Sequence, residues 1–301
     1  MYSTPMRERD VIKFLNERLP IGDDCAVIPF GKTNLLLTTD MLHRHTDFPE
    51  GITPYTMGWR AVAVSLSDIA AMGGRPLGVV IALGAPEFEK SFLEELFEGA
   101  LACCEACKTQ LLGGDTDRHS ELTLVTTALG EAPKPVLRSG ARPEELVCVT
   151  GDLGRTAAAL QLLSQKEHDQ ANQLLQFMPR LSEGQALAPL ARSMIDISDG
   201  LARSLYQLAE ASGVGFRIDA TAIPFALEVE ELARDQDELF EMGLFFGEDF
   251  ELLFTLPQEK LLEARKSCEF TVIGRTVPGK EGITMQLGRE SIALPDRGYE
   301  H

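Results

Sequence analysis

The sequence predicts an α/β protein with two domains. Short apolar segments alternate along the chain with segments whose apolar residues recur at helical spacing, which is typical of sheets covered by helices. The length of 301 residues suggests about two domains of ordinary size. Pro133, Pro135, Gly140 and Pro143 form the clearest linker signal, so we place the domains at residues 1–133 and 134–301.

In the first domain, three segments have the apolar spacing of a helix: residues 8–18, which Pro20 ends, 55–72 and 88–107. Four apolar segments have the character of strands: residues 34–39, 76–83, 110–112 and 121–129, the last rich in β-branched residues. In the second domain we expect strands at residues 145–150, 193–197, 215–218, 250–256 and 270–274, and helices at residues 155–163 and 201–211. Residues 164–173 are polar and show no clear period.

The composition is that of a globular protein with a strong acidic excess. Hydrophobic residues make up 44% of the chain, which is enough for a sizeable core. The 28 Lys and Arg against 46 Asp and Glu give a net charge of −18, which argues against non-specific binding of nucleic acid or anionic membranes. The chain has no apolar run of roughly 18 to 20 residues and no apolar signal segment at its start, so we expect a cytoplasmic protein.

The six cysteines are too irregularly spaced for a disulfide scaffold, and we expect reduced thiols. We interpret Cys104 and Cys107 as buried small hydrophobes, because no second ligand pair follows at zinc spacing. Among the five histidines only His43 and His45 have a spacing suited to ligands, and we interpret this pair as loop or surface.

Aspartates recur at the ends of apolar strands or next to glycine: Asp23, Asp24, Asp40, Asp68, Asp115, Asp196 and Asp199. Each alone is typical of a helix cap or a turn. Five separate segments carry them, however, and ligand crevices form at the strand ends of α/β sheets. So many carboxylates gathered in one place would repel each other unless cations neutralised them.

The residue types indicate which cation would neutralise these carboxylates. Carboxylates with Ser and Thr hydroxyls, and without nearby pairs of His or Cys, suit magnesium. Magnesium usually completes its shell with water and substrate phosphates, so we infer a nucleoside triphosphate as ligand. Glycines beside the aspartates would let backbone N–H groups approach the phosphates. The usual nucleotide motifs, such as the P-loop and the protein-kinase set, are absent from the sequence.

Seven motifs, five of which contain these aspartates, stand in the following order: Ile21-Gly-Asp-Asp-Cys-Ala, Thr38-Thr-Asp-Met-Leu, Ala63-Val-Ser-Leu-Ser-Asp-Ile-Ala-Ala-Met-Gly, Leu112-Gly-Gly-Asp-Thr, Leu137-Arg-Ser-Gly-Ala, Ile195-Asp-Ile-Ser-Asp-Gly-Leu and Gly247-Glu-Asp-Phe-Glu-Leu. In this order and at this spacing they resemble the thiamine-monophosphate kinase family over essentially the whole chain. The resemblance implies an aminoimidazole ribonucleotide synthetase-like fold, with an α+β N-terminal domain, a C-terminal α/β domain and an ATP cleft between them. It also implies a homodimer in which the N-terminal sheets of two subunits pair.

The activity that the resemblance implies is transfer of the ATP γ-phosphoryl group to thiamine monophosphate, the last step of thiamine diphosphate biosynthesis. By position, the implied magnesium ligands are Asp24, Thr39, Asp40, Asp68, Asp115, Asp196 and Asp199. The implied nucleotide contacts are Thr38, Gly114, Asp115, Arg138 and Ser198, and we expect Asp40, Asp115 and Asp199 to act in catalysis.

The implied substrate residues are Glu248, Asp47, Asp296 and Tyr299. Asp47 stands where the family commonly has histidine, and Asp296 where it often has an aromatic residue, with Tyr299 the nearest aromatic alternative. An aspartate beside a cationic thiazolium is electrostatically acceptable. The acceptor phosphate is already an oxyanion near neutral pH, with a second pKa of about 6, so direct in-line transfer needs no general base.

Two alternatives stay open at the level of sequence. One is another ATP-dependent enzyme of the same superfamily with a different acceptor. The hydrogenase maturation branch carries a functional cysteine at its C-terminus, whereas the last cysteine here is Cys268. The other is a non-catalytic sensor of magnesium-ATP.

Overall fold

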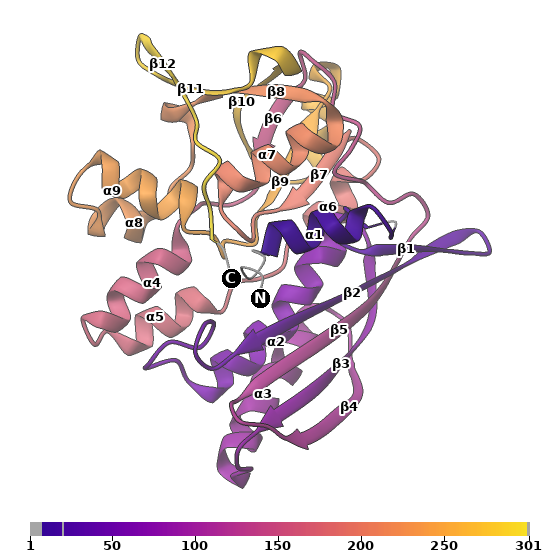
Figure 1. Cartoon of the computed structure of the whole chain (residues 1–301), viewed down its shortest axis with the longest axis vertical. Helices are drawn as coiled ribbons and strands as arrows, with labels where there is room; N and C mark the ends of the chain where they lie inside the picture. Colours follow the sequence, from indigo (N-terminus) through magenta and orange to yellow (C-terminus); the bar gives the residue numbers. More distant parts are fainter. Residues whose placement is uncertain (1–7, 20, 300–301) are drawn as a thin grey trace, which may run out of the picture.

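The computed structural model describes residues 8–19 and 21–299. The chain forms two sheets with helices between and around them, and the N-terminal sheet and the C-terminal sheet lie at opposite ends of the molecule in Figure 1. The α/β class predicted from the sequence is confirmed. The expected domain boundary lies between the last strand of the first sheet, which ends at Ala132, and the first strand of the second, which begins at Leu146.

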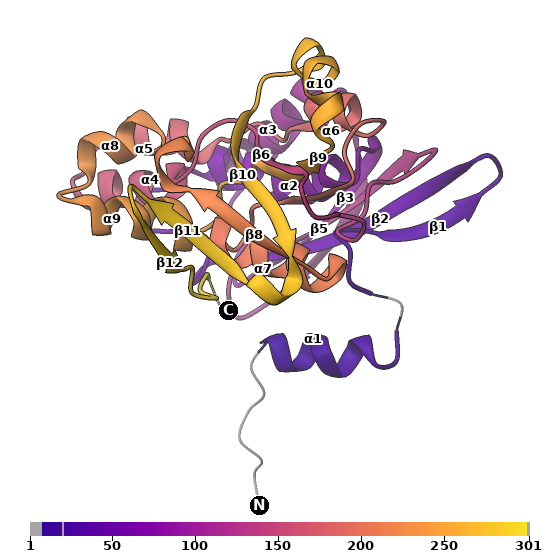
Figure 2. The same cartoon turned by 90° about the horizontal axis from the view of Figure 1, so that it is seen from above.

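The N-terminal sheet has five strands in the order β1-β2-β5-β3-β4. They are β1 (Ala26–Phe30), β2 (Thr33–His43), β3 (Arg75–Ala85), β4 (Leu111–Arg118) and β5 (Thr123–Ala132). Only β3 and β4 pair in parallel within this sheet. A short helix, α1 (Glu8–Asn16), precedes the sheet and stands apart from the rest of the molecule (Figure 2). The β1–β2 hairpin projects from the body of the molecule in the same view.

Helix α2 (Pro54–Ala71) lies between the sheet and the second domain. It begins with proline in its first turn, and the Thr53 side chain accepts a hydrogen bond from the N–H of Thr56, a favourable N-terminal cap. Most of its residues are buried, because it packs on β2 and β5, on α3 (Lys90–Ala106) and on the second domain. A Cβ at Gly58 would lie 1.8 Å from the Leu96 carbonyl oxygen, so only glycine lets α2 and α3 approach this closely.

The second sheet has seven strands in the order β12-β11-β8-β10-β6-β9-β7. They are β6 (Leu146–Val149), β7 (Ser193–Asp196), β8 (Val214–Asp219), β9 (Leu252–Leu256), β10 (Thr271–Pro278), β11 (Ile283–Leu287) and β12 (Glu290–Ala293). The α-helices of this domain are α4 (Arg155–Ser164), α5 (His168–Leu175), α6 (Leu181–Leu187), α7 (Leu201–Ser212), α8 (Leu227–Leu232), α9 (Gln236–Phe240) and α10 (Leu261–Ser267). A single turn of π-helix, η2 (Glu241–Phe245), follows α9.

The N-terminal sheet leaves one face open. Side chains of β2 alternate between the face that α2 covers, where Leu36 and Leu42 are buried, and an outer face. On the outer face Leu37 is 39% exposed, Met41 54% and Val80 38%. A row of apolar side chains this accessible on a sheet is unusual unless another surface covers it.

Every strand and helix expected from the sequence is present, with ends shifted by a few residues. Sequence patterns missed several elements, among them β1, whose short apolar segment is exposed throughout, and α5, which lies mostly in the polar stretch. Cys104 and Cys107 are buried and free, which confirms their interpretation as small hydrophobes. Among the described residues, no helix is both long and apolar enough to cross a membrane.

Candidate active site

Three aspartates from both domains meet beside the inner end of α2. Asp24 precedes β1, Asp68 lies in the last turn of α2, and Asp196 ends β7. One carboxylate oxygen from each lies within 4.8 Å of the other two. Asp40 of β2 faces the same region, because its Oδ2 accepts a hydrogen bond of 2.7 Å from Ser65 Oγ on α2. We call these four residues the carboxylate cluster.

Neighbouring donors hold the carboxylate cluster in place. Thr38 Oγ1 donates to Asp68, and Ser67 Oγ donates to Asp196 Oδ2 at 2.5 Å. The serines come from alternate positions of the motif Ser65-Leu-Ser67-Asp68, so a single helical turn supplies one aspartate of the carboxylate cluster and two hydroxyls that bind two of the others. The motif is visible in the sequence, but the sequence does not show that Ser65 donates to an aspartate of β2 and Ser67 to an aspartate of β7.

Arg138 brings a positively charged side chain to the carboxylate cluster. Its Nη2 and Nε donate to Asp24 Oδ1 at 2.6 and 3.2 Å, and its backbone N–H donates to Asp23 Oδ1 at 2.8 Å. Burial alone would lower the pKa of the Arg138 guanidinium, but the Asp24 carboxylate raises this pKa above its usual range. The second oxygen of Asp24, Oδ2, is shielded from solvent and accepts no hydrogen bond.

One arginine does not neutralise four carboxylates. Burial, and then the charges of Asp40, Asp196 and Asp24, raise the pKa of Asp68 well above its ordinary value. Burial, followed by the charge of Asp24, raises the pKa of Asp196 to about 8. Burial also raises the pKa of Asp40. An unsatisfied carboxylate oxygen and mutual repulsion are what a divalent cation relieves, and an all-oxygen donor set fits magnesium.

These pKa shifts predict how pH and magnesium act together. The raised pKa of Asp196 means that, between about pH 4 and pH 8, the folded metal-free protein binds more protons than the unfolded chain, so its stability falls as pH rises through that window. Magnesium displaces the proton, so it should stabilise the protein more at pH 8 than at pH 6. Thermal melting in EDTA and in magnesium at the two pH values measures this. A magnesium-induced shift that is equal at both pH values would contradict it.

The structure places Asp115 apart from the carboxylate cluster of its own chain. Met41 of β2, Val125 of β5, Ala82 of β3 and Asp115 of β4 are successive partners across the sheet, and paired residues project from the same face. Asp115 therefore shares the outer face with Met41, whereas Asp40 points to the opposite face. Thr39 also lies on the outer face, where its hydroxyl accepts a hydrogen bond of 3.1 Å from Thr127. Gly114 packs so closely on β3 that a Cβ would lie 1.7 Å from the Ile81 carbonyl oxygen.

Ser198 and Asp199 lie in the short loop between β7 and α7, next to Asp196. Two segments distant in sequence hold this loop through its backbone: the N–H of Glu248 donates to the Ser198 carbonyl at 2.6 Å, and the N–H of Tyr299 donates to the Asp199 carbonyl at 3.1 Å. The loop ends in Gly200 with φ +99°, directly before the first turn of α7. Its side chains thus lie at a helix N-terminus, where backbone N–H groups favour phosphate.

Three of the four expected substrate residues, Asp47, Glu248 and Tyr299, lie in one neighbourhood. Burial, and then the carboxylates of Asp47 and Glu248, raise the pKa of Tyr299, so both carboxylates lie near this side chain. Glu248 has a left-handed backbone, φ +57°, and its Oε2 lies 3.1 Å from Nη2 of Arg60, a buried residue of α2. Asp47 Oδ2 accepts hydrogen bonds from the His43 N–H and the Thr46 hydroxyl, both at 2.6 Å. Asp296 accepts a hydrogen bond from Arg203 at 2.7 Å.

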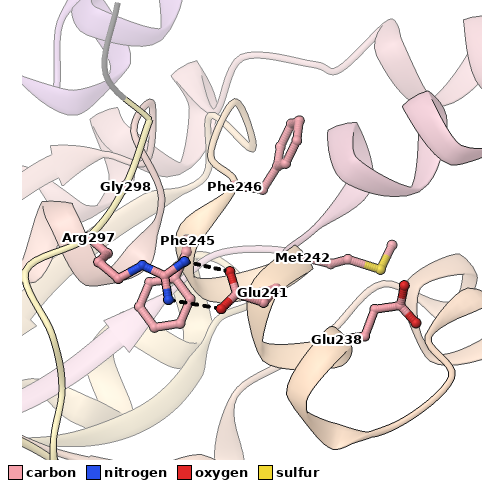
Figure 3. A pocket seen from close by; sticks show the side chains of 7 residues that line it. All are labelled: Glu238, Glu241, Met242, Phe245, Phe246, Arg297 and Gly298. Atoms are coloured by element: carbon pink, nitrogen blue, oxygen red, sulfur yellow. Dashed lines mark hydrogen bonds and ion pairs between the residues drawn. The ribbon is translucent and has the colours of Figure 1, made fainter.

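A cavity of about 300 Å³ opens between η2 and the C-terminal segment. The residues that line it are Glu238, Glu241, Met242, Phe245, Phe246, Arg297 and Gly298 (Figure 3). Arg297 forms two hydrogen bonds to Glu241, at 2.8 and 2.9 Å, and covers one face of the Phe245 ring. The Arg297 guanidinium thus already occupies the cation position on Phe245 and pairs with the carboxylate of Glu241.

Two carboxylates of the motif Gly247-Glu-Asp-Phe-Glu-Leu have structural roles that the sequence did not indicate. Asp249 Oδ1 accepts hydrogen bonds from the N–H groups of Gly154 and Arg155, at 2.8 and 3.1 Å, and so caps α4. Glu251 accepts two hydrogen bonds from Arg180 and one from Thr150. Both residues are buried, and together they fix the loop that carries Glu248.

Comparisons with known proteins show the family to which the chain belongs. Residues 22–132 match the family described as AIR synthase related protein, N-terminal domain, and residues 142–286 match the corresponding C-terminal domain. A thiamine-monophosphate kinase of Halobacterium salinarum is 44% identical over 282 residues, which cover 93% of this chain and 94% of that protein. The chain belongs to the thiamine-monophosphate kinase family.

A second member of the thiamine-monophosphate kinase family, from Escherichia coli, is 34% identical over 95% of this chain and 93% of its own length. Among solved structures, AaThiL complexed with AMPPCP and TMP superposes with a TM-score of 0.88 at 30% identity and covers 100% of both chains. The resemblance seen in the sequence motifs and the two-domain AIR synthase-like fold are thus confirmed. The matched regions contain the first sheet and strands β6 to β11, and the carboxylate cluster draws on both.

Proposed function

We propose that this chain is an ATP-dependent kinase that phosphorylates thiamine monophosphate to thiamine diphosphate, with magnesium as the required cation. The observation that carries the proposal is its full-length similarity to AaThiL, which was solved with AMPPCP and TMP bound. The carboxylate cluster adds the chemistry that such a reaction needs, because it can hold divalent cations at the boundary of the two domains.

In the proposed mechanism the residues of this chain position the reacting phosphates and hold the cations that neutralise their charge. Asp24, Asp40, Asp68 and Asp196 would hold the metal ions, with Asp199 at the adjacent loop. Bound magnesium would supply charge neutralisation and in-line alignment of the phosphates. Ser198 and the first turn of α7 offer hydrogen-bond donors to phosphate oxygens, and Thr38 orients Asp68. The acceptor phosphate is its own nucleophile, so this chain needs no catalytic base.

For the acceptor, we place the cationic ring system beside Glu248, Asp47 and Tyr299. The backbone N–H of Tyr299 is bonded to the Asp199 carbonyl, so this residue joins the loop that carries Ser198 and Asp199 to the neighbourhood of the two carboxylates. Asp296 is held by Arg203 and contributes charge at the edge of this region.

We further propose a cytoplasmic homodimer that is built through the outer face of the N-terminal sheet. Leu37, Met41 and Val80 would be covered by a second copy. This arrangement also gives Asp115 a role: it projects from the face that meets the partner and would complete the partner's nucleotide site, with Gly114 beside it on β4. The proposed domains are residues 1–133, which carry this face, and 134–301, which complete the cleft.

The decisive experiment follows the products. Purified protein is incubated with ATP, magnesium and thiamine monophosphate, and thiamine phosphates and adenine nucleotides are separated by chromatography. We expect equal amounts of thiamine diphosphate and ADP, and none of either with EDTA. Binding of magnesium-ATP without thiamine diphosphate formation would refute the proposal and favour another acceptor or a non-catalytic sensor.

A charge-neutral variant tests the role of Asp47. Asp47→Asn keeps an oxygen that can accept hydrogen bonds from His43 and Thr46 but removes the negative charge near the acceptor ring. We expect the KM for thiamine monophosphate to rise about tenfold, which corresponds to about 1.4 kcal/mol, with the KM for ATP unchanged. Steady-state kinetics with each substrate varied in turn measures both constants. An equal rise in the two KM values would show that Asp47 has only a structural role.

A further inference from the structure

Helix α2 carries a single arginine, and its side chain lies in the buried surface of the helix. The Arg60 side chain is only 1% exposed. A guanidinium keeps its charge at every pH at which proteins fold, and burying it without a carboxylate partner is costly. The partner comes from the other domain, since Nη2 of Arg60 lies 3.1 Å from Oε2 of Glu248. This ion pair links α2 to a residue that we expect to bind the substrate.

Contacts inside the packed core fix the Arg60 guanidinium. Nη1 donates a hydrogen bond of 3.2 Å to the carbonyl of Leu175, the last residue of α5, where helix carbonyls lack partners within the helix. The guanidinium carbon lies 5.7 Å from the centre of the Phe177 ring. That ring stacks on Phe250 with the ring centres 4.3 Å apart, and the Phe177 carbonyl accepts a hydrogen bond of 2.7 Å from Trp59 Nε1. The position of the guanidinium is therefore set by the protein interior.

Two nitrogens of Arg60 still lack an acceptor. Nε and Nη2 are shielded from solvent and donate no hydrogen bond, although Glu248 Oε2 lies close enough to Nη2 for one. Buried N–H groups of a charged side chain are costly to leave unsatisfied. A small rotation of the Glu248 carboxylate would align it with Nη2, and this side chain has room to turn because it is 26% exposed. Arg60 therefore favours one orientation of the carboxylate, with Oε2 toward the helix and Oε1 left for another partner.

The backbone of Glu248 is already fixed on both sides. Its N–H donates to the Ser198 carbonyl at 2.6 Å, and its carbonyl accepts a hydrogen bond of 2.7 Å from the Thr156 hydroxyl. Its φ of +57° is a left-handed conformation, which a residue other than glycine keeps only where its surroundings impose it. The side-chain torsions are the freedom that remains, so the contact with Arg60 decides where the carboxylate points.

The helix that carries Arg60 also holds the carboxylate cluster. Ser67 lies two helical turns further along α2, about 11 Å along the axis and on the same face. There its hydroxyl donates to Asp196. One helix therefore sets the spacing between the metal site proposed for the phosphates and the carboxylate proposed for the ring of the acceptor.

We propose that Arg60 is a positioning residue of the acceptor site, which orients the Glu248 carboxylate toward the cationic ring of the acceptor. This inference rests on the proposed function, from which it takes the acceptor. Because Arg60 is buried and Glu248 is partly exposed, the carboxylate stands between the guanidinium and the acceptor. Arg60 thus acts through Glu248 and does not touch the acceptor itself.

Steady-state kinetics on a double-mutant cycle tests the proposal. Arg60→Met removes the guanidinium and keeps an unbranched apolar side chain, and Glu248→Ala removes the carboxylate. We expect each variant to raise the KM for thiamine monophosphate about tenfold and to leave kcat and the KM for ATP at the parental values. The double variant should show the same rise, because Arg60 has nothing to orient once Glu248 is gone. Arg60→Lys, which keeps a cation that can donate to Glu248, should lie between the parent and Arg60→Met.

Several results would overturn the proposal. Independent roles would multiply, giving a rise of about a hundredfold in the double variant. A parental KM for thiamine monophosphate in Arg60→Met or Glu248→Ala, or an equal rise in both KM values, would count against it in the same way. If Arg60→Met does not fold, a higher KM in the double variant than in Glu248→Ala decides against it. Arg192→Met, the control, breaks a pair with Glu145 at the end of β7 opposite to Asp196 and should change neither KM.

Melting temperature separates a failure of this inference from a failure of the proposed function. A parent that forms no thiamine diphosphate would refute the proposed function, whereas the cycle on melting temperature still tests the contact between Arg60 and Glu248. Glu248→Ala leaves a buried guanidinium unpaired, so the double variant should lose less melting temperature than the two single variants lose together. A loss equal to their sum would show that the two side chains are not coupled, and it would overturn the positioning role whatever the acceptor.

Discussion

Asp68→Asn should abolish turnover and yet raise the melting temperature of the metal-free protein. The side chain lies at the centre of the carboxylate cluster, and burial followed by three neighbouring carboxylates raises its pKa well above the ordinary value. A carboxyl whose folded pKa is raised destabilises the folded state progressively as pH rises above its unfolded pKa. Asparagine carries no charge, so this cost disappears in the variant. Without the carboxylate, however, magnesium loses a central ligand.

We expect kcat to fall on the order of a thousandfold, the factor that corresponds to several kcal/mol of lost charge neutralisation. In EDTA at pH 8 the variant should melt above the parent, and in magnesium below it. The reversal is the informative result, because a merely damaged fold would melt lower in both buffers. Asp169→Asn, an exposed aspartate on α5, serves as the matched control and should change neither quantity. Near-parental turnover with normal magnesium dependence would exclude Asp68 as a ligand.

Mixing two inactive variants should restore activity if Asp115 acts across the dimer. Asp115 lies on the outer face of its own sheet, opposite to Asp40, so we expect it to serve the site of the partner subunit. Asp115→Asn alone should lose turnover by orders of magnitude while the protein stays folded. Asp68→Asn alone should be equally inactive. A dimer with one subunit of each kind has one site that contains both native aspartates.

Random reassortment of the two variants should restore roughly a quarter of the parental activity, since half of the dimers are mixed and each mixed dimer has one intact site. Subunits are exchanged under mild denaturant, and activity is compared with that of each variant treated alone. Mixing Asp68→Asn with Asp196→Asn provides the control, because both residues belong to the same chain's cluster and no intact site can form. Recovery in the control, or none in the test mixture, would refute a shared site.

The carboxylate cluster could be predicted from sequence because each of its aspartates lies in a recognisable local motif. Asp24, Asp40, Asp68 and Asp196 lie beside apolar segments and within two residues of Gly, Ser or Thr, and ligand crevices form at the strand ends of α/β sheets. The faces of the sheet could not be predicted in the same way. Whether Asp115 points with Asp40 or away from it depends on strand order and register, and no single segment records either of them.

The arrangement of the residues proposed to bind the acceptor was harder to predict from sequence, because it depends on contacts between distant parts of the chain. The Arg60 that lies beside Glu248 is in the middle of an apolar helix, and nothing in its neighbourhood indicates an ion pair. The sequence also could not separate the three carboxylates at residues 248–251, because the cap on α4 and the contact with Arg180 join parts of the chain about 70 to 95 residues apart.

Arg138 lies in the segment that joins the two sheets, and there it holds Asp23 and Asp24 of the first domain. The remaining residues of the carboxylate cluster are divided between the domains, with Asp40 and Asp68 on one side and Asp196 on the other. The segment that joins the two domains and the proposed metal site therefore share Arg138. A cation bound by this cluster would tie Asp196 of the second domain to Asp24 and Asp68 of the first, so metal binding would also strengthen the contact between the domains.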